Sequence, residues 1–157
     1  MASFMLHLAV ALIWLFLAAQ PTLAAFVVGL AIGFALLWVF RRIVGSENYI
    51  RRSLGLFRFI GIFIREFIKS NLVIAWAALA RRRSDIHPDF IRYSVAGLTP
   101  LERFLLAQVI TLTPGTTAVD IVDEDILLVH AFDAENPEGV CSGIDQTLKR
   151  GILAFTR

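Results

Sequence analysis

The first 40 residues of this 157-residue chain contain no Asp, Glu, Lys or Arg. One transmembrane helix needs only about 20 apolar residues, so this stretch is long enough for two. The whole chain is 57% hydrophobic and 18% charged, against roughly 45–50% and 25% in soluble globular domains. A soluble monomer is therefore not expected, and the length excludes a large multidomain enzyme.

Cysteine is nearly absent, and the charges that exist are unevenly placed. Cys141 is the single cysteine, which excludes an intramolecular disulfide and any zinc site built from several thiolates. Residues 41–89 carry ten basic and four acidic side chains, whereas residues 90–157 carry five basic and nine acidic ones. A basic region beside an apolar stretch suits anionic lipid headgroups better than nucleic acid, so no nucleic-acid partner is expected.

The apolar region divides at Gln20-Pro21-Thr22, where the proline can open the next helix as its first residue. We predict helices over residues 3–19 and 22–40, and hence a transmembrane α-helical hairpin as the first domain, residues 1–40. The alternative is a cleaved signal peptide ending near Ala19, which the lack of a preceding Lys or Arg opposes.

The orientation of this hairpin follows from the positive-inside rule. The turn between the two helices is uncharged, whereas residues 41–52, which follow the second helix, include four arginines. We therefore expect a multi-pass protein of the bacterial plasma membrane with both termini in the cytoplasm. His7 is the one imidazole in the hairpin, and a hydrogen-bonded structural role is expected for it rather than a proton relay.

Residues 41–85 are predicted to form a basic linker and an amphipathic interfacial helix. The stretch 54–80 is apolar enough to suggest a third span, but Arg58, Arg65 and Lys69 share one narrow stripe of a helix. Each of these cations would cost about 2.5–3.5 kcal/mol near the bilayer centre. We therefore predict a helix lying in the membrane plane, with these three side chains contacting the membrane surface or another subunit.

The third domain, residues 86–157, is predicted to be a small cytoplasmic α+β module of order β-α-β-β-α, similar to a split βαβ unit. Strands are expected over 90–96, 117–122 and 126–132, and an amphipathic helix over 140–155. Thr99, Pro100 and Glu102 predict a helix start with a capping box. The expected buried face of that helix consists of Leu101, Phe104, Leu105, Val109 and Leu112.

Two polar motifs in this module are candidates for function. Thr113-Pro114-Gly115-Thr116 lacks the glycine spacing and lysine of a phosphate loop, so we interpret it as a rigid helix-to-strand turn with Gly115 at positive φ. An acidic cluster matches no calcium loop and is expected to be solvated or to contact a basic partner. Its members are Asp120, Asp123, Glu124, Asp125, His130 and Asp133. No catalytic residue, cofactor or metal site is predicted.

The run Thr111-Leu112-Thr113-Pro114-Gly115-Thr116 resembles a signature of the E subunit of Mrp-type (Mnh) multisubunit monovalent cation/proton antiporters. Glu66 with Ser70-Asn71-Leu72, Pro88 and the paired N-terminal helices extend the resemblance over nearly the whole chain. It implies an accessory subunit of a complex that exchanges external protons for cytoplasmic sodium or potassium. The implied partners are the other subunits of the antiporter and membrane lipids, and the large subunits would carry the main proton channels.

The residues themselves agree with an accessory role. Neither predicted span contains a carboxylate or lysine, which are the usual carriers of protons or cations within a membrane. We therefore expect a nonenzymatic subunit that contributes to assembly, with a contribution to the cation path left open. Two alternatives remain at this point: a membrane-anchored metal-dependent enzyme that uses the acidic hairpin, and a channel that assembles from this chain alone.

Overall fold

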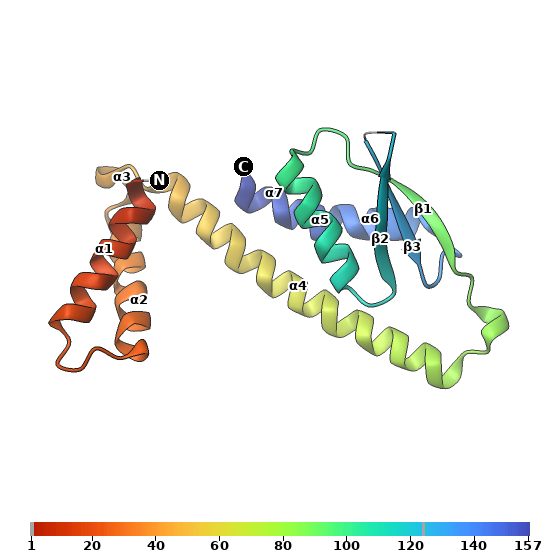
Figure 1. The fold of residues 1–157 in the computed structure, drawn as a ribbon, viewed down its shortest axis with the longest axis horizontal. Coiled ribbons are helices and arrows are strands. Elements are labelled where there is room, and N and C mark those ends of the chain that lie inside the picture. The colour runs from red at the N-terminus through yellow and green to blue at the C-terminus, as the bar shows by residue number, and fades with distance from the viewer. Residues whose placement is uncertain (1, 124) are drawn as a thin grey trace. The chain divides into compact units, whose positions relative to one another are not determined.

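The computed structural model describes residues 2–123 and 125–157 (Figure 1). The chain consists of two compact units, Met1–Leu54 and Gly55–Arg157. The first is entirely helical, and the second combines helices with a three-stranded antiparallel sheet. Each unit is described by itself.

The first unit contains α1 (Ala2–Leu17), α2 (Leu23–Val39), α3 (Arg41–Val44) and the start of α4 (Glu47–Ala80). Thr22 is the N-cap of α2, and its hydroxyl accepts a hydrogen bond from the N–H of Ala25 at 3.1 Å. The prediction that Pro21 opens this helix was wrong, because the proline precedes the cap. Both predicted helices form, but they are shorter than expected, with 16 and 17 residues. Across residues 2–123 and 125–157, we find no helix with both the length and the apolarity to cross a membrane.

The predicted basic linker is mostly helical. Gly45 ends α3 in the left-handed conformation (φ +67°), and Ser46 is fully buried with its hydroxyl donating to the carbonyl of Leu37 at 3.1 Å. The following helix, α4, then runs without a break for 34 residues. It therefore begins seven residues before the amphipathic helix expected from residue 54.

The second unit contains the rest of α4, a short 3₁₀ turn η1 (Arg83–Asp85), and the α+β module. The module's elements are β1 (Asp89–Ser94), α5 (Pro100–Leu112), β2 (Thr116–Val122), β3 (Ile126–Ala131), α6 (Pro137–Ile144), the π-helical η2 (Asp145–Lys149) and α7 (Arg150–Thr156). The strand order is β1-β3-β2, with both outer strands antiparallel to β3. The strands β1 and β2 are therefore parallel to each other and joined by α5, which confirms the predicted split βαβ arrangement.

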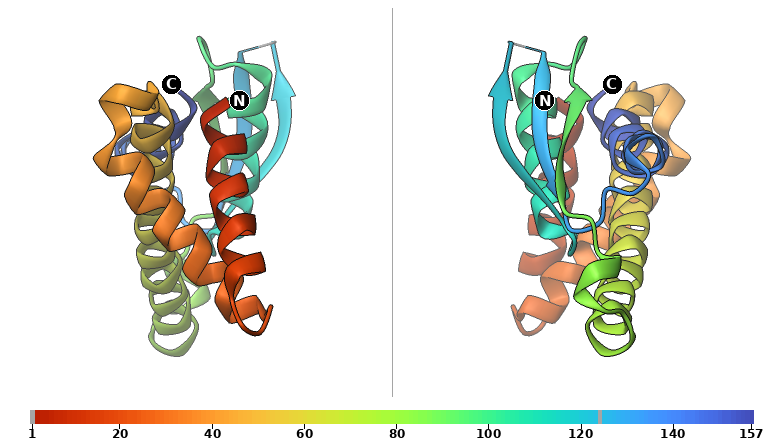
Figure 2. Two further views of the ribbon diagram at one scale, coloured as in Figure 1. Left: turned by 90° about the vertical axis from the view of Figure 1, so that its left-hand side faces the viewer. Right: turned by 90° about the vertical axis from the view of Figure 1, so that its right-hand side faces the viewer.

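The helices α5, α6 and α7 all lie on one side of this sheet, as both views in Figure 2 show. The core between them is apolar, with Tyr93 and Val129 from the sheet, Leu106 and Ile110 from α5, and Ile152 from α7. In β1, Ile91 and Tyr93 are buried and their neighbours are exposed, which is the alternation typical of a strand with one face against a core. The helix α4 joins the core through Phe59, whose ring lies 5.4 Å from that of Phe155.

The buried face of α5 differs from the prediction. Glu102, Leu106 and Ile110 are buried, whereas Leu101, Phe104 and Leu112 are 58–61% exposed, so these three were wrongly assigned to the core. Leu105 and Val109 are half-buried against the core. The error has a physical cause. A prediction from apolar residues assigns every carboxylate to the exposed side, but the first buried residue of α5 is Glu102.

The last helix is confirmed, with Ile144, Leu148 and Ile152 buried. These residues repeat every four positions, slightly more than the 3.6 residues of an α-helical turn. The π-helical segment Asp145–Lys149 is wider, because its hydrogen bonds run from residue i to i+5. This local widening keeps all three side chains on the side that faces the core.

Candidate functional site

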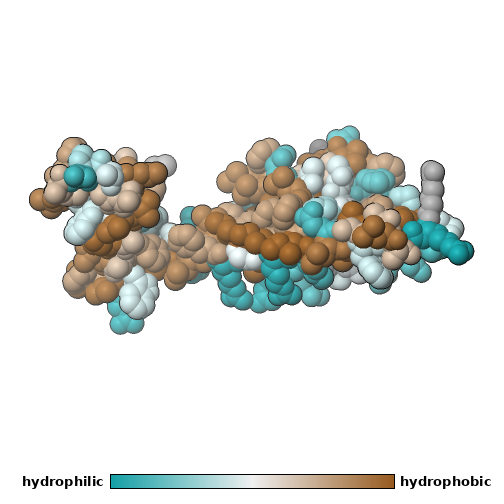
Figure 3. All heavy atoms as spheres, turned by 90° about the horizontal axis from the view of Figure 1, so that it is seen from below, coloured by the Kyte–Doolittle hydropathy of each residue, from teal (hydrophilic) through white to brown (hydrophobic). Residues whose placement is uncertain are grey.

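The outward side of α4 in the second unit is apolar and exposed. We call it the outer face of α4; its members are Phe57, Ile60, Ile64, Ile68, Leu72 and Leu79, each 43–87% exposed. Figure 3 looks onto this helix and shows a continuous hydrophobic band with hydrophilic side chains along one side. Phe59 and Phe63 point the other way, into the core. The apolar residues of α4 in the second unit therefore divide between the core and this outer face.

The cationic row beside the outer face consists of Arg58, Arg65 and Lys69. All three lie within α4, so the helix places them along one side as their spacing predicted. Glu66 lies between two of them, 3.7 Å from Arg65 and 3.8 Å from Lys69. The side chains of Arg65 and Lys69 are 79% and 67% exposed, and such exposed pairs are weak. The row therefore keeps its positive character toward the surroundings; what it contacts stays a prediction.

The turn Thr113-Pro114-Gly115-Thr116 fastens the end of α5 to the sheet. The last carbonyls of a helix lack partners within the helix. Here the Thr113 hydroxyl donates to the carbonyl of Val109 at 2.9 Å, and the Thr116 hydroxyl donates to that of Ile110, also at 2.9 Å. Gly115 has φ +95°, which confirms the predicted positive φ, and its carbonyl accepts from the N–H of Phe132 at 2.8 Å.

A groove of about 250 Å³ lies between this turn and α4. One wall is α4 and the other is the turn with the end of β3; the lining residues include Glu66, Lys69, Ser70, Ile74, the four residues of the turn, Phe132 and Asp133. A Cβ atom added at Gly115 would lie 3.2 Å from Cδ1 of Ile74. Residues of the sequence signature that are more than 40 positions apart thus meet at one place in the fold.

Three members of the predicted acidic cluster are each paired with an arginine. Asp123 pairs with Arg92 and Asp125 with Arg103, both at 2.6 Å, while Asp133 pairs with Arg81 at 2.5 Å. His130 packs edge-on against Phe90, with ring centroids 5.2 Å apart. Glu124 lies outside the described residues. The expected basic partners of these carboxylates are therefore arginines of the same chain.

The most deeply buried carboxylate is Glu102, which connects α5 to the C-terminal helix. It accepts from the N–H of Thr99 and the hydroxyl of Thr156, each at 2.8 Å, and pairs with Arg157 at 3.1 Å. The capping box predicted from Thr99 and Glu102 is confirmed. The Arg157 guanidinium, with the Thr99 N–H, lowers the pKa of Glu102 to about 2. This carboxylate is therefore an ionised structural clamp.

The pKa values of Tyr93, Cys141 and Asp133 are also shifted, and burial or a hydrogen bond within the fold explains each shift. Burial and a 2.6 Å hydrogen bond to Asp145 raise the pKa of Tyr93 above its ordinary value. Burial raises the pKa of Cys141, so its thiol stays protonated and is a poor nucleophile. The Arg81 hydrogen bond lowers the pKa of Asp133.

His7 is held at the interface of α1 and α2. Its Nε2 lies 2.7 Å from the carbonyl of Leu30, which only accepts, so Nε2 carries the hydrogen. Its Nδ1 then accepts from the Tyr49 hydroxyl at 2.6 Å when the ring is neutral. This arrangement is the hydrogen-bonded structural role expected for His7.

Two glycines let α1 and α2 approach each other, and the sequence interpretation missed them. A Cβ atom at Gly29 would lie 2.8 Å from the carbonyl oxygen of Ala11, and one at Gly33 would lie 2.8 Å from Cδ2 of His7. The signal was present as Gly29-x-x-x-Gly33 in an apolar helix, a pattern typical of close helix packing in membranes.

An apolar helix pair, a helix with an exposed apolar face and a cationic row, and a small α+β module define a protein built around contact surfaces. The family described as Na+/H+ ion antiporter subunit (MNHE) matches residues 7–155. The chain belongs to this family, which confirms the resemblance to antiporter E subunits. It is thus a subunit of a multisubunit cation/proton antiporter, a membrane transport complex in which its partners are other subunits.

Individual relatives agree along nearly the full length. The chain is 31% identical over 154 residues to the Na(+)/H(+) antiporter E subunit of Alkalihalophilus pseudofirmus, covering 98% of this chain and 97% of the relative. It is 29% identical to the corresponding protein of Bacillus subtilis with the same coverage. It is also similar to a chain of the membrane-bound sulfane sulfur reductase, an archaeal respiratory membrane complex, with 25% identity, a TM-score of 0.50 and coverage of 85% and 84%. These relatives give no support to the metal-dependent enzyme or the self-assembling channel.

Proposed function

We propose that this chain is an accessory, non-catalytic subunit that helps to assemble a Na+ (or K+)/H+ antiporter. The observation that carries the proposal is that the side chains and backbone of the turn Thr113-Pro114-Gly115-Thr116 are engaged in structural contacts. The hydroxyls of Thr113 and Thr116 bind backbone carbonyls, and Gly115 supplies a positive φ that other residues resist. The most specific sequence motif therefore joins the end of α5 to the end of β3, beside α4.

The decisive test is Gly115→Val, with antiport activity divided by the amount of assembled complex in membrane vesicles. Strain at positive φ costs about 1–3 kcal/mol, and a larger side chain would also meet Ile74. We expect less assembled complex and unchanged turnover per complex. Gly97→Val is the matched comparison, because Gly97 also has positive φ (+73°) and carries the same backbone strain, but has no atom within 4 Å of an added Cβ. It should lower the amount of assembled complex less than Gly115→Val does. Normal assembly with slow turnover would instead place the turn in the cation path.

We further propose that α1 and α2 form a hairpin embedded in the plasma membrane. Their exposed side chains include Phe4, Ile13, Phe16, Leu23 and Val28, and neither helix contains a charged residue. Helices of 16 and 17 residues are about 24–26 Å long, somewhat short of the ~30 Å hydrocarbon layer. A bilayer accommodates short helices by local thinning at a modest cost in free energy.

In this arrangement both termini lie in the cytoplasm, because the arginines at 41, 42, 51 and 52 follow the second helix. Fusions of alkaline phosphatase, which is active only outside the cytoplasm, test the proposal at each terminus. Both fusions should be inactive. Activity at either one would contradict the orientation.

The outer face of α4 is proposed to lie along the cytoplasmic membrane surface, with Arg58, Arg65 and Lys69 toward anionic headgroups. Replacing all three with Glu should weaken membrane or subunit docking of the second unit while the hairpin stays inserted. The matched control exchanges the cations (Arg58→Lys, Arg65→Lys, Lys69→Arg), which keeps the charge and should preserve docking. Protease accessibility of the second unit in membrane vesicles reports the result. Equal accessibility in the Glu variant and the control would contradict the proposal.

A further inference from the structure

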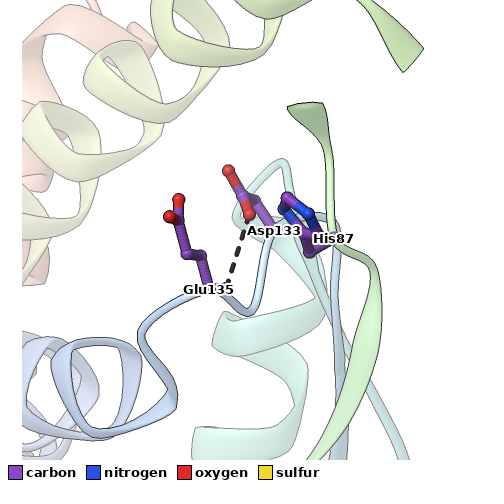
Figure 4. Close-up of side chains that lie close together, drawn as sticks. All are labelled: His87, Asp133 and Glu135. Atoms are coloured by element: carbon purple, nitrogen blue, oxygen red, sulfur yellow. Dashed lines mark hydrogen bonds between the residues drawn. The ribbon is translucent and has the colours of Figure 1, made fainter. Parts of the chain in front are cut away.

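His87, Asp133 and Glu135 lie close together at one end of the sheet (Figure 4). His87 belongs to the segment that leads into β1, and the two carboxylates follow β3. One ligand atom from each residue lies within 4.8 Å of the other two. The sequence pattern does not reveal this group, because His87 is 46 positions from Asp133 and only the pairing of β1 with β3 brings them together.

The backbone around the group is held from several directions. The N–H of Ala134 donates to the carbonyl of His87 at 2.8 Å, so the two segments are tied to each other. Arg81 donates to Oδ2 of Asp133 at 2.5 Å and also to the carbonyl of Asp85. The backbone N–H of Glu135 donates to Oδ1 of Asp133, with 3.4 Å between nitrogen and oxygen. Asp133 is therefore oriented by an outer arginine, as ligating carboxylates commonly are by their neighbours.

We propose that His87, Asp133 and Glu135 form a site for a divalent transition metal ion, with Zn²⁺ as the ion of choice. One imidazole with two carboxylates is a donor set that suits zinc, whereas calcium and magnesium take oxygen ligands. Water would complete the coordination. The two carboxylates outweigh the one guanidinium of Arg81, so the group has the negative charge that a divalent ion needs.

The geometry requires a small contraction. Zinc binds nitrogen and oxygen at about 2.0–2.2 Å, so ligand atoms in a tetrahedral site lie roughly 3–4 Å apart. His87 and Glu135 are exposed and can rotate to close the remaining gap, whereas Asp133 stays fixed by Arg81. Because two of the three ligands must be ordered on binding, a micromolar dissociation constant is expected rather than the tight binding of a structural zinc site.

The site is distinct from the acidic hairpin considered from the sequence, with which it shares only Asp133. Bound metal would connect the segment before β1 to the loop after β3 and, through Arg81, to the end of α4. The inference does not rest on the antiporter assignment, since it concerns the chain alone.

The test uses the purified full-length chain in mild detergent, without a polyhistidine tag and after removal of metal with a chelator. Zn²⁺ is titrated against a chromophoric chelator, and Co²⁺ absorption reports coordination by nitrogen and oxygen. We expect one Zn²⁺ per chain, and at least tenfold weaker binding in His87→Ala and in Glu135→Gln. Asp133 is left intact because its replacement would also break the pair with Arg81.

His130→Ala is the matched control, since it removes an imidazole that packs against Phe90 outside the group. It should bind Zn²⁺ as the unchanged chain does. Thermal melts of each variant show that the fold is retained. The proposal is overturned if the unchanged chain binds no Zn²⁺ at 100 times the protein concentration, or if His87→Ala and Glu135→Gln bind as tightly as His130→Ala.

Discussion

In Met1–Leu54 the helices meet through glycine, whereas in Gly55–Arg157 they meet through large buried side chains. The α1–α2 contact is made at Gly29, Gly33 and Ala11, and most large side chains of these helices point outward. In the module, Leu106, Ile110 and Ile152 are at most 1% exposed. In water, helices associate mainly because apolar side chains are removed from the solvent. In lipid this driving force is absent, and helix pairs are stabilised by the close packing that small residues allow. The glycine contacts of the first unit therefore agree with the proposed place of its helices in lipid, and the large buried side chains of the second unit agree with folding in water.

The largest expected effect tests the core of the second unit. Leu106→Ala should lower the free energy of unfolding by about 2–5 kcal/mol, because Leu106 is fully buried and the change leaves a cavity. Phe104→Ala on the same helix should change it by no more than about 0.5 kcal/mol, since Phe104 is 60% exposed. Thermal melts of the full chain in detergent make the comparison. A larger loss for Phe104→Ala would reverse the assignment of the buried face.

A smaller effect tests the glycine contact of the first unit. Gly29→Val would place Cβ 2.8 Å from the backbone oxygen of Ala11, so the helices must separate at a cost of about 1–3 kcal/mol. Gly61→Val is the control, because Gly61 has no atom within 4 Å of an added Cβ. The measurement is the yield of folded chain in membranes. Equal yields for the two variants would show that close backbone approach is not what holds α1 to α2.

The third effect separates polar from apolar stabilisation within the module. Glu102→Gln removes the charge that pairs with Arg157 and should cost roughly 1–3 kcal/mol. Since the pKa of Glu102 is lowered from 4.5 to about 2 in the folded chain, its contribution is present above pH 4.5 and is lost as the pH falls toward 2.

Melting temperatures between pH 6 and pH 3 check this pH dependence. The gap between the unchanged chain and Glu102→Gln should narrow with acid, because below pH 4.5 the unfolded chain takes up a proton at Glu102 while the folded chain still holds the charge. Glu138→Gln, at an exposed position, should follow the unchanged chain throughout. A gap that stays constant down to pH 3 would mean that Glu102 acts through its shape and not its charge.

The sequence predicts most elements of this fold, because local signals determine them. The capping box at Thr99, the positive φ at Gly115 and the alternation in β1 all depend on near neighbours. The errors arise where a distant partner decides. Glu102 is buried because Arg157 and Thr156 reach it from the end of the chain, which no helical pattern reveals. The same holds for the groove beside Gly115 and for the His87 group, which need the sheet pairing to exist.

The π-helical segment Asp145–Lys149 makes the last helix tolerant of a shorter chain. A π-helical turn holds one residue more than the matching α-helical stretch, so removing one residue would return the segment to an ordinary α-helix while the residues beyond it keep their direction. Ile152 would then stay in the core, and Arg157 would still face Glu102. Gln146 is exposed, so its deletion would remove no buried contact. The same deletion within α5, which has no such segment, would rotate everything beyond it by about 100°.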